Sequence, residues 1–156
     1  MKWKRVRGAC LAFAAAALLI DRLTKLWALG PLTRAGGSMG GVGGVFAFTL
    51  ARNPGAAFSV FADHPGIVAA LSAVILTALG ATAFFSRAFS GSARLCLSLV
   101  WAGGVGNLID RALYGSVIDF LRIEFIPFPI FNFADICVTV GAVWYAARLL
   151  LGAERA

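Results

Sequence analysis

An uncharged run of twenty residues, 66–85, constrains this chain more than any other feature, and it ends directly before Ser86 and Arg87. A helix rises 1.5 Å per residue, so this run would be about 30 Å long, the thickness of a bilayer's hydrocarbon core. The whole chain has 156 residues, of which 60% are hydrophobic and 13% charged, against about 25% charged residues in ordinary soluble domains. The run and the composition together predict an integral membrane protein and exclude a disordered chain or a typical soluble enzyme.

Three further apolar segments resemble membrane spans but carry charges, such as Asp21, Arg22 and Lys25 in the first. A charge at mid-bilayer costs at least about 2.5 kcal/mol on insertion scales, so these exceptions need a structural reason. We expect a single membrane-embedded domain over residues 1–156, all-α, with four transmembrane helices and a small β-hairpin or sheet over the outer membrane face. The expected spans are 8–29, 66–85, 95–110 and 135–151, and the expected external segments are 30–65 and 111–134.

The basic residues predict the orientation of these spans. They lie before the first span, between the second and third, and at the C-terminal end: Lys2, Lys4, Arg5, Arg7, Arg87, Arg94, Arg148 and Arg155. The positive-inside rule then predicts that both termini are cytoplasmic. The net charge of +7 is therefore assigned to topology, and no nucleic-acid partner is expected, since the charges form no continuous stripe. A cleaved signal peptide is the alternative for the first segment, but no small-residue cleavage site follows its apolar run.

The first external segment predicts local β-structure. Residues 36–44 are rich in glycine and are expected to be flexible, whereas the β-branched and aromatic residues in 45–50 predict a short strand. Asn53, Pro54 and Gly55 then give a turn signal. We therefore expect a hairpin lying on the membrane surface.

Cysteine and histidine offer little chemistry. Cys10, Cys96 and Cys137 lie within apolar stretches, and His64 is the single histidine. With no metal-ligand spacing and an odd cysteine count, we expect neither a disulfide framework, nor a metal site, nor a cofactor.

Four of the five aspartates fall at one predicted level, the outer membrane interface, although they are far apart in sequence: Asp21, Asp110, Asp119 and Asp135. The three asparagines, Asn53, Asn107 and Asn132, lie near the same level. Helix spacing places Asn107 near Asp110 and Asn132 near Asp135, where an amide can donate to a carboxylate. Simple helix capping is the alternative role for each asparagine.

The available chemistry is therefore that of carboxylates. Two carboxyl groups held close together cannot both ionise easily, so one keeps a proton. The ionised member can activate water while the other protonates a leaving group, as hydrolysis of a peptide bond requires without a metal or a covalent intermediate.

Five ordered motifs make the chain recognisable. They are Asp21-Arg22-Leu23-Thr24-Lys25, Asn53-Pro54-Gly55-Ala56-Ala57-Phe58, Gly103-Gly104-Val105-Gly106-Asn107-Leu108-Ile109-Asp110-Arg111, Val117-Ile118-Asp119-Phe120 and Phe131-Asn132-Phe133-Ala134-Asp135. In this order they closely resemble lipoprotein signal peptidase, or signal peptidase II, a family of bacterial intramembrane aspartic proteases. The resemblance spans residues 21 to 141.

This resemblance implies an aspartic endopeptidase of the bacterial inner membrane, with its active site at the outer face. It would remove the signal peptide from diacylglyceryl-modified prolipoproteins by cleaving before the lipidated cysteine, in contact with membrane lipid and as a monomer. The catalytic pair falls on Asp119 and Asp135. Residues that would bind substrate or order the site are Asn53, Gly55, Ala56, Phe58, Asn107, Arg111 and Asn132. Residues that would support the framework are Asp21, Lys25 and Asp110.

Two other functional classes remain open from the residues themselves. A small proton-coupled transporter or channel subunit also uses aspartates within the membrane, and a non-catalytic membrane assembly factor could contain them too. Neither class requires a surface hairpin beside two aspartates at one interface. The stretch from Phe120 to Ile130 is unusually apolar, and we expect it to face the acyl chains of a substrate.

Overall fold

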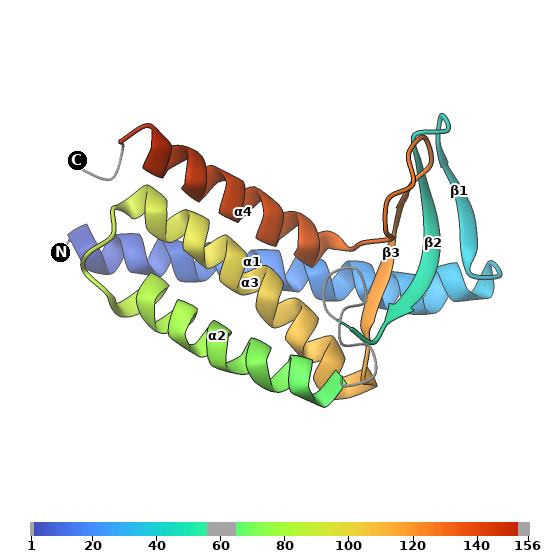
Figure 1. The fold of residues 1–156 in the computed structure, drawn as a ribbon, viewed down its shortest axis with the longest axis horizontal. Coiled ribbons are helices and arrows are strands. Elements are labelled where there is room, and N and C mark those ends of the chain that lie inside the picture. Colours follow the sequence, from blue (N-terminus) through green and yellow to red (C-terminus); the bar gives the residue numbers. More distant parts are fainter. Residues whose placement is uncertain (1, 56–64, 153–156) are drawn as a thin grey trace.

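The computed structural model describes residues 2–55 and 65–152, which form a helical bundle with a small sheet at one end (Figure 1). α1 begins and α4 ends at the opposite end of the bundle. In chain order the elements are α1 (Lys2–Trp27), the π-helix η1 (Ala28–Leu32), β1 (Ser38–Val42), β2 (Phe46–Asn53), α2 (Pro65–Phe85), α3 (Gly91–Tyr114), β3 (Val117–Ile123) and α4 (Phe133–Leu150).

α3 is the central helix and packs against α1, α2 and α4. Glycines make this packing close. A Cβ atom at Gly103 would overlap the backbone of Ala134 in α4, and one at Gly106 would overlap the Asp21 carboxylate in α1. The glycine-rich sequence of α3 therefore brings the polar residues of α1 and α4 against its own.

Within the described residues, three helices are long and apolar enough to cross a membrane: Gly66–Phe85, Gly91–Tyr114 and Phe133–Leu150. α2 and α4 cover nearly the same residues as the second and fourth expected spans. α3 extends about one turn beyond the expected 95–110 at each end. α1 is 26 residues long but carries several charged side chains near its two ends, so it does not meet the same criterion.

The sheet is antiparallel, with the strand order β1-β2-β3. In β3, Ile118 and Phe120 pack against Ala28 and Leu32 of η1, the π-helix that directly follows α1. Side chains alternate along a strand, so Asp119 between them points to the other face. Packing of β3 on the end of α1 therefore fixes which way Asp119 points.

One expectation about the external segments is wrong, and one strand was not expected. Residues 36–44 contain the strand β1 instead of a flexible stretch, because β1 pairs with β2 and glycines with positive φ turn the chain at both its ends. The segment 111–134 contains the third strand, β3, paired with β2 from Phe46 to Asn53. Of the predicted turn, Asn53 accepts a hydrogen bond from the Gly55 amide at 3.1 Å, whereas Ala56 and Phe58 lie outside the described residues.

Candidate active site

Asp119 and Asp135 approach each other from different elements, Asp119 from β3 and Asp135 from the first turn of α4. Asn132 joins them. Its side-chain amide donates to Asp119 Oδ1 at 2.6 Å, and its backbone N–H donates to Asp135 Oδ2 at 3.0 Å. One asparagine thus holds both carboxylates.

Asn132 is also the N-cap of α4. Its side-chain oxygen accepts a hydrogen bond from the Asp135 amide at 3.0 Å, which completes a capping box. In a capping box the two side chains satisfy backbone N–H groups that a helix start leaves unpaired. The two roles considered for Asn132, capping and carboxylate positioning, are therefore fulfilled together, because its amide has a donor end and an acceptor end.

Asn107 contacts Asp135 and not Asp110. Its side-chain amide donates to Asp135 Oδ1 at 2.8 Å, while its oxygen accepts from Asn132 at 3.1 Å and from Lys25 Nζ at 2.8 Å. The helix spacing within α3 suggested Asp110 as the partner. Packing of α3 against α4 overrides that spacing, since the two helices bring residues 28 positions apart into contact.

A buried group of opposite charges lies next to this network. Lys25 Nζ is 3.2 Å from Asp21 Oδ2 and 2.8 Å from Asp110 Oδ2, and all three side chains are at most 2% exposed. Arg22 bridges the same two aspartates at 2.9 and 2.8 Å. Two cations and two carboxylates therefore balance, which is the condition under which charges are tolerated away from water.

This charged group also fixes the two elements that carry the catalytic candidates. Asp21 Oδ1 accepts a hydrogen bond from the Ala134 amide at 3.1 Å, next to Asp135 in α4. Asp110 Oδ2 accepts one from the Ile118 amide at 3.1 Å, next to Asp119 in β3. Each of these aspartates thus holds the backbone of a residue next to one of the two candidate carboxylates.

Arg111 connects α3 to the segment after β2. Its Nη2 donates to the Gly55 carbonyl at 2.8 Å and its Nη1 to the Asn107 carbonyl at 3.4 Å. Arg111 and Asn53 both line the cavity described below. The expected polar site residues that the structure describes therefore lie together with Gly55 in one region around Asp119 and Asp135.

The environment of Asp119 favours its protonated form. Burial, first, and the nearby charge of Asp135 raise the pKa of Asp119 from 3.8 to about 6, although hydrogen bonds from Asn132 and Asn53 and the charge of Lys25 lower it. Burial disfavours the charged form of any carboxyl group, and a like charge adds to this effect. Asp119 is thus suited to hold a proton that the pair shares.

A cavity of about 760 Å³ opens at the two aspartates and continues between α2, α3 and α4. Its polar end is formed by Asn53, Asn107, Arg111, Asp119 and Asp135. Its apolar wall includes Ile75, Leu79, Val100, Val138 and Phe128. The site can therefore hold an extended polar backbone at one end and an apolar group at the other.

Among residues 2–55 and 65–152, no cluster of three or more His, Cys, Asp or Glu side chains is arranged to hold a metal ion.

Arg22, which sequence reasoning did not select, completes the charged group and also donates to the Gly106 carbonyl at 3.0 Å. Its position next to Asp21 in the first motif is the sequence feature that could have indicated this role.

Known proteins resemble this chain along nearly its whole length. The family profile described as signal peptidase (SPase) II matches residues 13–151. A lipoprotein signal peptidase of Clostridium acetobutylicum is 36% identical over 140 residues, covering 88% of this chain and 90% of that protein. One from Synechocystis sp. is 39% identical over 129 residues, covering 82% and 79%.

Solved structures agree with the sequence relatives. A structure titled as a bacterial membrane enzyme solved by the in meso method superposes with a TM-score of 0.82 at 28% identity, covering 95% of this chain and 91% of that one. A second, under the same kind of title, gives a TM-score of 0.81 at 30% identity. With five motifs, a matching profile and a shared fold, the chain belongs to the signal peptidase II family of membrane peptidases.

Proposed function

We propose that this chain cleaves the signal peptide from diacylglyceryl-modified prolipoproteins, with Asp119 and Asp135 as the catalytic pair. The observation that carries this assignment is the hydrogen bonding of both carboxylates to Asn132, at 2.6 and 3.0 Å. A single residue at the start of α4 thereby holds two carboxyl groups at the polar end of one cavity. This is the arrangement that general acid–base hydrolysis of a peptide bond requires.

The two aspartates would divide the proton transfers. Both oxygens of Asp135 accept hydrogen bonds, from Asn107 and Asn132, which offsets part of the cost of burying its charge. Asp119, with a pKa of about 6, would carry the shared proton when substrate excludes water. Asp135 would then take a proton from the attacking water as Asp119 donates one to the leaving amide nitrogen.

The cavity supports a lipid-bearing substrate. Its apolar wall reaches α2 and α4, whose outward side chains such as Val74 and Val143 are exposed and apolar. Acyl chains could thus remain in the bilayer while the peptide backbone reaches the aspartates. Each buried methylene contributes about 0.8 kcal/mol, so two chains would dominate recruitment. Phe128, which lines this cavity, would contact them, and Phe128→Asp is expected to impair cleavage more than Phe128→Ala.

We further propose that α1 is the fourth transmembrane helix. Its charged residues Asp21 and Lys25 are buried against α3 and α4, whereas Leu19, Leu23 and Leu26 are more than half exposed. A helix whose outward side is apolar and whose charges are paired inside avoids the cost of placing charges in lipid. The molecule would then be a monomer of one domain, with both termini cytoplasmic and the sheet at the outer face of the inner membrane.

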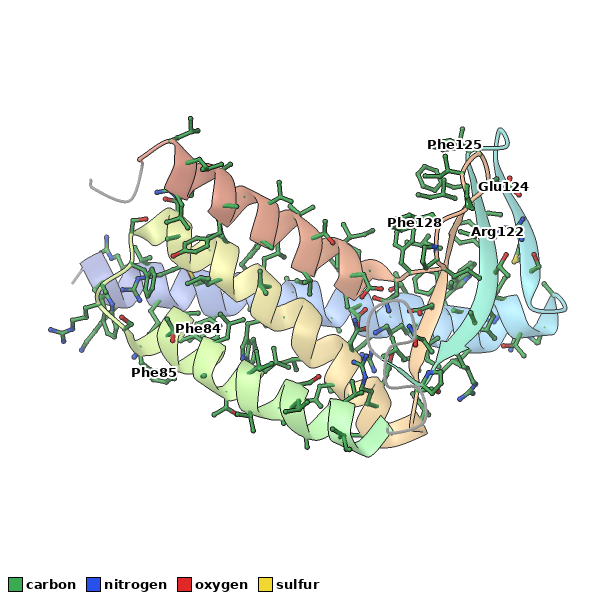
Figure 2. All side chains as sticks on the ribbon, in the orientation of Figure 1. Phe84, Phe85, Arg122, Glu124, Phe125 and Phe128 are labelled. Atoms are coloured by element: carbon green, nitrogen blue, oxygen red, sulfur yellow. The ribbon has the colours of Figure 1, made fainter. Side chains whose placement is uncertain are left out.

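The decisive experiment is cleavage by purified protein of a prolipoprotein with and without its diacylglyceryl group, followed by gel shift. We expect cleavage of the modified form only, and no cleavage by Asp119→Asn or Asp135→Asn. Glu124→Gln is the matched control, because Glu124 is an exposed carboxylate on the loop after β3 (Figure 2). Near-normal turnover by either aspartate variant would reject the pair, and equal cleavage of both substrates would reject lipid-dependent recognition.

Topology provides an independent test. A reporter fused after Ala156 should be cytoplasmic, and one inserted between Gly36 and Gly44 should be external. The reverse result would place the aspartates on the wrong side for a translocated signal peptide and reject the proposal. Absence of cleavage together with proton flux in reconstituted vesicles would favour the transporter instead.

A further inference from the structure

The end of the bundle opposite the sheet contains a cluster of arginines around one indole ring. The guanidinium carbons of Arg7, Arg87 and Arg94 lie 4.8, 5.3 and 5.8 Å from the centre of the Trp3 ring. These residues come from α1, from the connection between α2 and α3, and from the first turn of α3. Figure 2 shows nitrogen-tipped side chains gathered at this end, near the labelled Phe85.

The positive charges of this cluster have no carboxylate partner in the described part of the chain. The ion pairs found there all join Arg22 or Lys25 to Asp21 or Asp110, toward the other end of the bundle. Arg94 is 2% exposed and is held by the carbonyls of Phe89 and Ala83. Like charges gathered this closely repel one another unless an anion lies between them.

Trp3 supplies a second, independent indication of a ligand. Its indole Nε1–H is buried and has no acceptor among the described residues. An indole N–H that is out of water normally finds a hydrogen-bond acceptor. The surrounding arginines favour a negatively charged acceptor for this N–H, which a small shift of the side chains that cover it would expose.

The nearby apolar surface indicates which anion fits. Phe85, at the end of α2, is 68% exposed, and the Arg7 guanidinium lies 5.9 Å from its ring. Phe85 also ends the uncharged span, so the cluster lies at the depth of lipid headgroups. Basic pockets between helices at this depth bind anionic headgroups, and guanidinium groups match phosphate oxygens in two-point hydrogen bonding.

We propose that Trp3, Arg7 and Arg87, with the buried Arg94 beside the same ring, bind the phosphate of an anionic glycerophospholipid. The acyl chains of this lipid would lie along Phe85 and α2. This site is separate from the aspartate pair and at the other end of the bundle. The proposal requires only that the bundle spans a bilayer, and it does not depend on which residues are catalytic.

The test is titration of the detergent-solubilised full chain with dioleoyl-phosphatidylglycerol, measured by native mass spectrometry. We expect phosphatidylglycerol to bind at least roughly tenfold more tightly than dioleoyl-phosphatidylcholine, and Arg7→Gln with Arg87→Gln to remove that preference. The matched control is Lys4→Gln with Arg5→Gln, which removes two exposed charges from the same end. It should change the affinity by less than about twofold.

Several results would overturn the site. Equal losses in the two double variants would mean diffuse attraction, and equal binding of phosphatidylcholine would mean that the charges do not select the lipid. Full displacement of the lipid by equimolar inorganic phosphate would mean a free-anion site. If the Arg7 and Arg87 double variant fails to fold, Trp3→Phe decides the matter. It keeps the ring but lacks Nε1–H, so a loss of roughly threefold or more is expected, and an unchanged affinity would reject the site.

Discussion

Replacing Asp119 by Asn should abolish cleavage and, at neutral pH, stabilise the folded protein. Asp119 is 3% exposed, and its carboxyl group lies close enough to Asp135 for that charge to raise its pKa. Asn keeps the shape and an oxygen that can accept the hydrogen bond from Asn132. Asn lacks the charge. The variant therefore avoids the free-energy cost of burying a carboxylate, and it also loses the group proposed to transfer a proton.

The size of this effect follows from the pKa of Asp119, which is about 6 in the folded protein against 3.8 ordinarily. At about 1.36 kcal/mol per pKa unit, the difference corresponds to about 3 kcal/mol. Between these two pKa values the folded state binds more protons than the unfolded state. Its stability therefore falls as the pH rises through this range, and the loss is complete above the folded pKa. The advantage of Asp119→Asn over wild type should grow from about 1 kcal/mol at pH 4.5 to about 3 kcal/mol at pH 7.5.

The assay is unfolding by sodium dodecyl sulfate in mixed micelles, monitored by tryptophan fluorescence at several pH values. The difference between the variant and wild type is the informative quantity, because other groups titrate equally in both. Glu124→Gln serves as the control, since its exposed carboxylate should give no pH-dependent difference. A difference for Asp119→Asn that stays flat with pH, or that favours wild type at neutral pH, would refute the reasoning.

Three further predictions follow from the same contacts. The kcat/KM for prolipoprotein cleavage should fall as the pH rises above about 6, because the proposed catalytic pair loses its shared proton; initial rates from about pH 5 to pH 9 test this, and a flat profile would contradict it. Lys25→Met should lower the unfolding free energy by about 3–5 kcal/mol, because Asp21 and Asp110 lose a buried partner; detergent unfolding measures it, and a neutral effect would reject the pairing. Gly106→Ala should cost about 1–3 kcal/mol, since its Cβ would overlap the Asp21 carboxylate, whereas Gly40→Ala, in open space, should cost little in the same melts.

The sequence by itself determined the membrane character and the identity of the chemical groups. The uncharged run at residues 66–85 corresponds to α2 because a helix of that length and composition matches a bilayer without help from tertiary contacts. The order of the five motifs was sufficient to indicate the family, and Asn132 next to an α4 start was visible as a capping signal. These features are local, so residue type and spacing specify them.

Only the tertiary structure decided which groups meet. Asn107 pairs with Asp135, Lys25 with Asn107, and Asp21 with the Ala134 amide, across 28, 82 and 113 positions of the chain. Such contacts depend on how α1 and α4 are oriented against α3. The glycines of α3 permit this close packing, but residue spacing within a single helix does not predict it. β3 was missed for a related reason: Val117 to Phe120 is buried on both faces, so it lacks the alternation that marks a half-exposed strand. The pairing of β3 with β2 and its packing on the end of α1 direct Asp119 toward the cavity, because neighbouring elements determine which face of a strand is turned to which side.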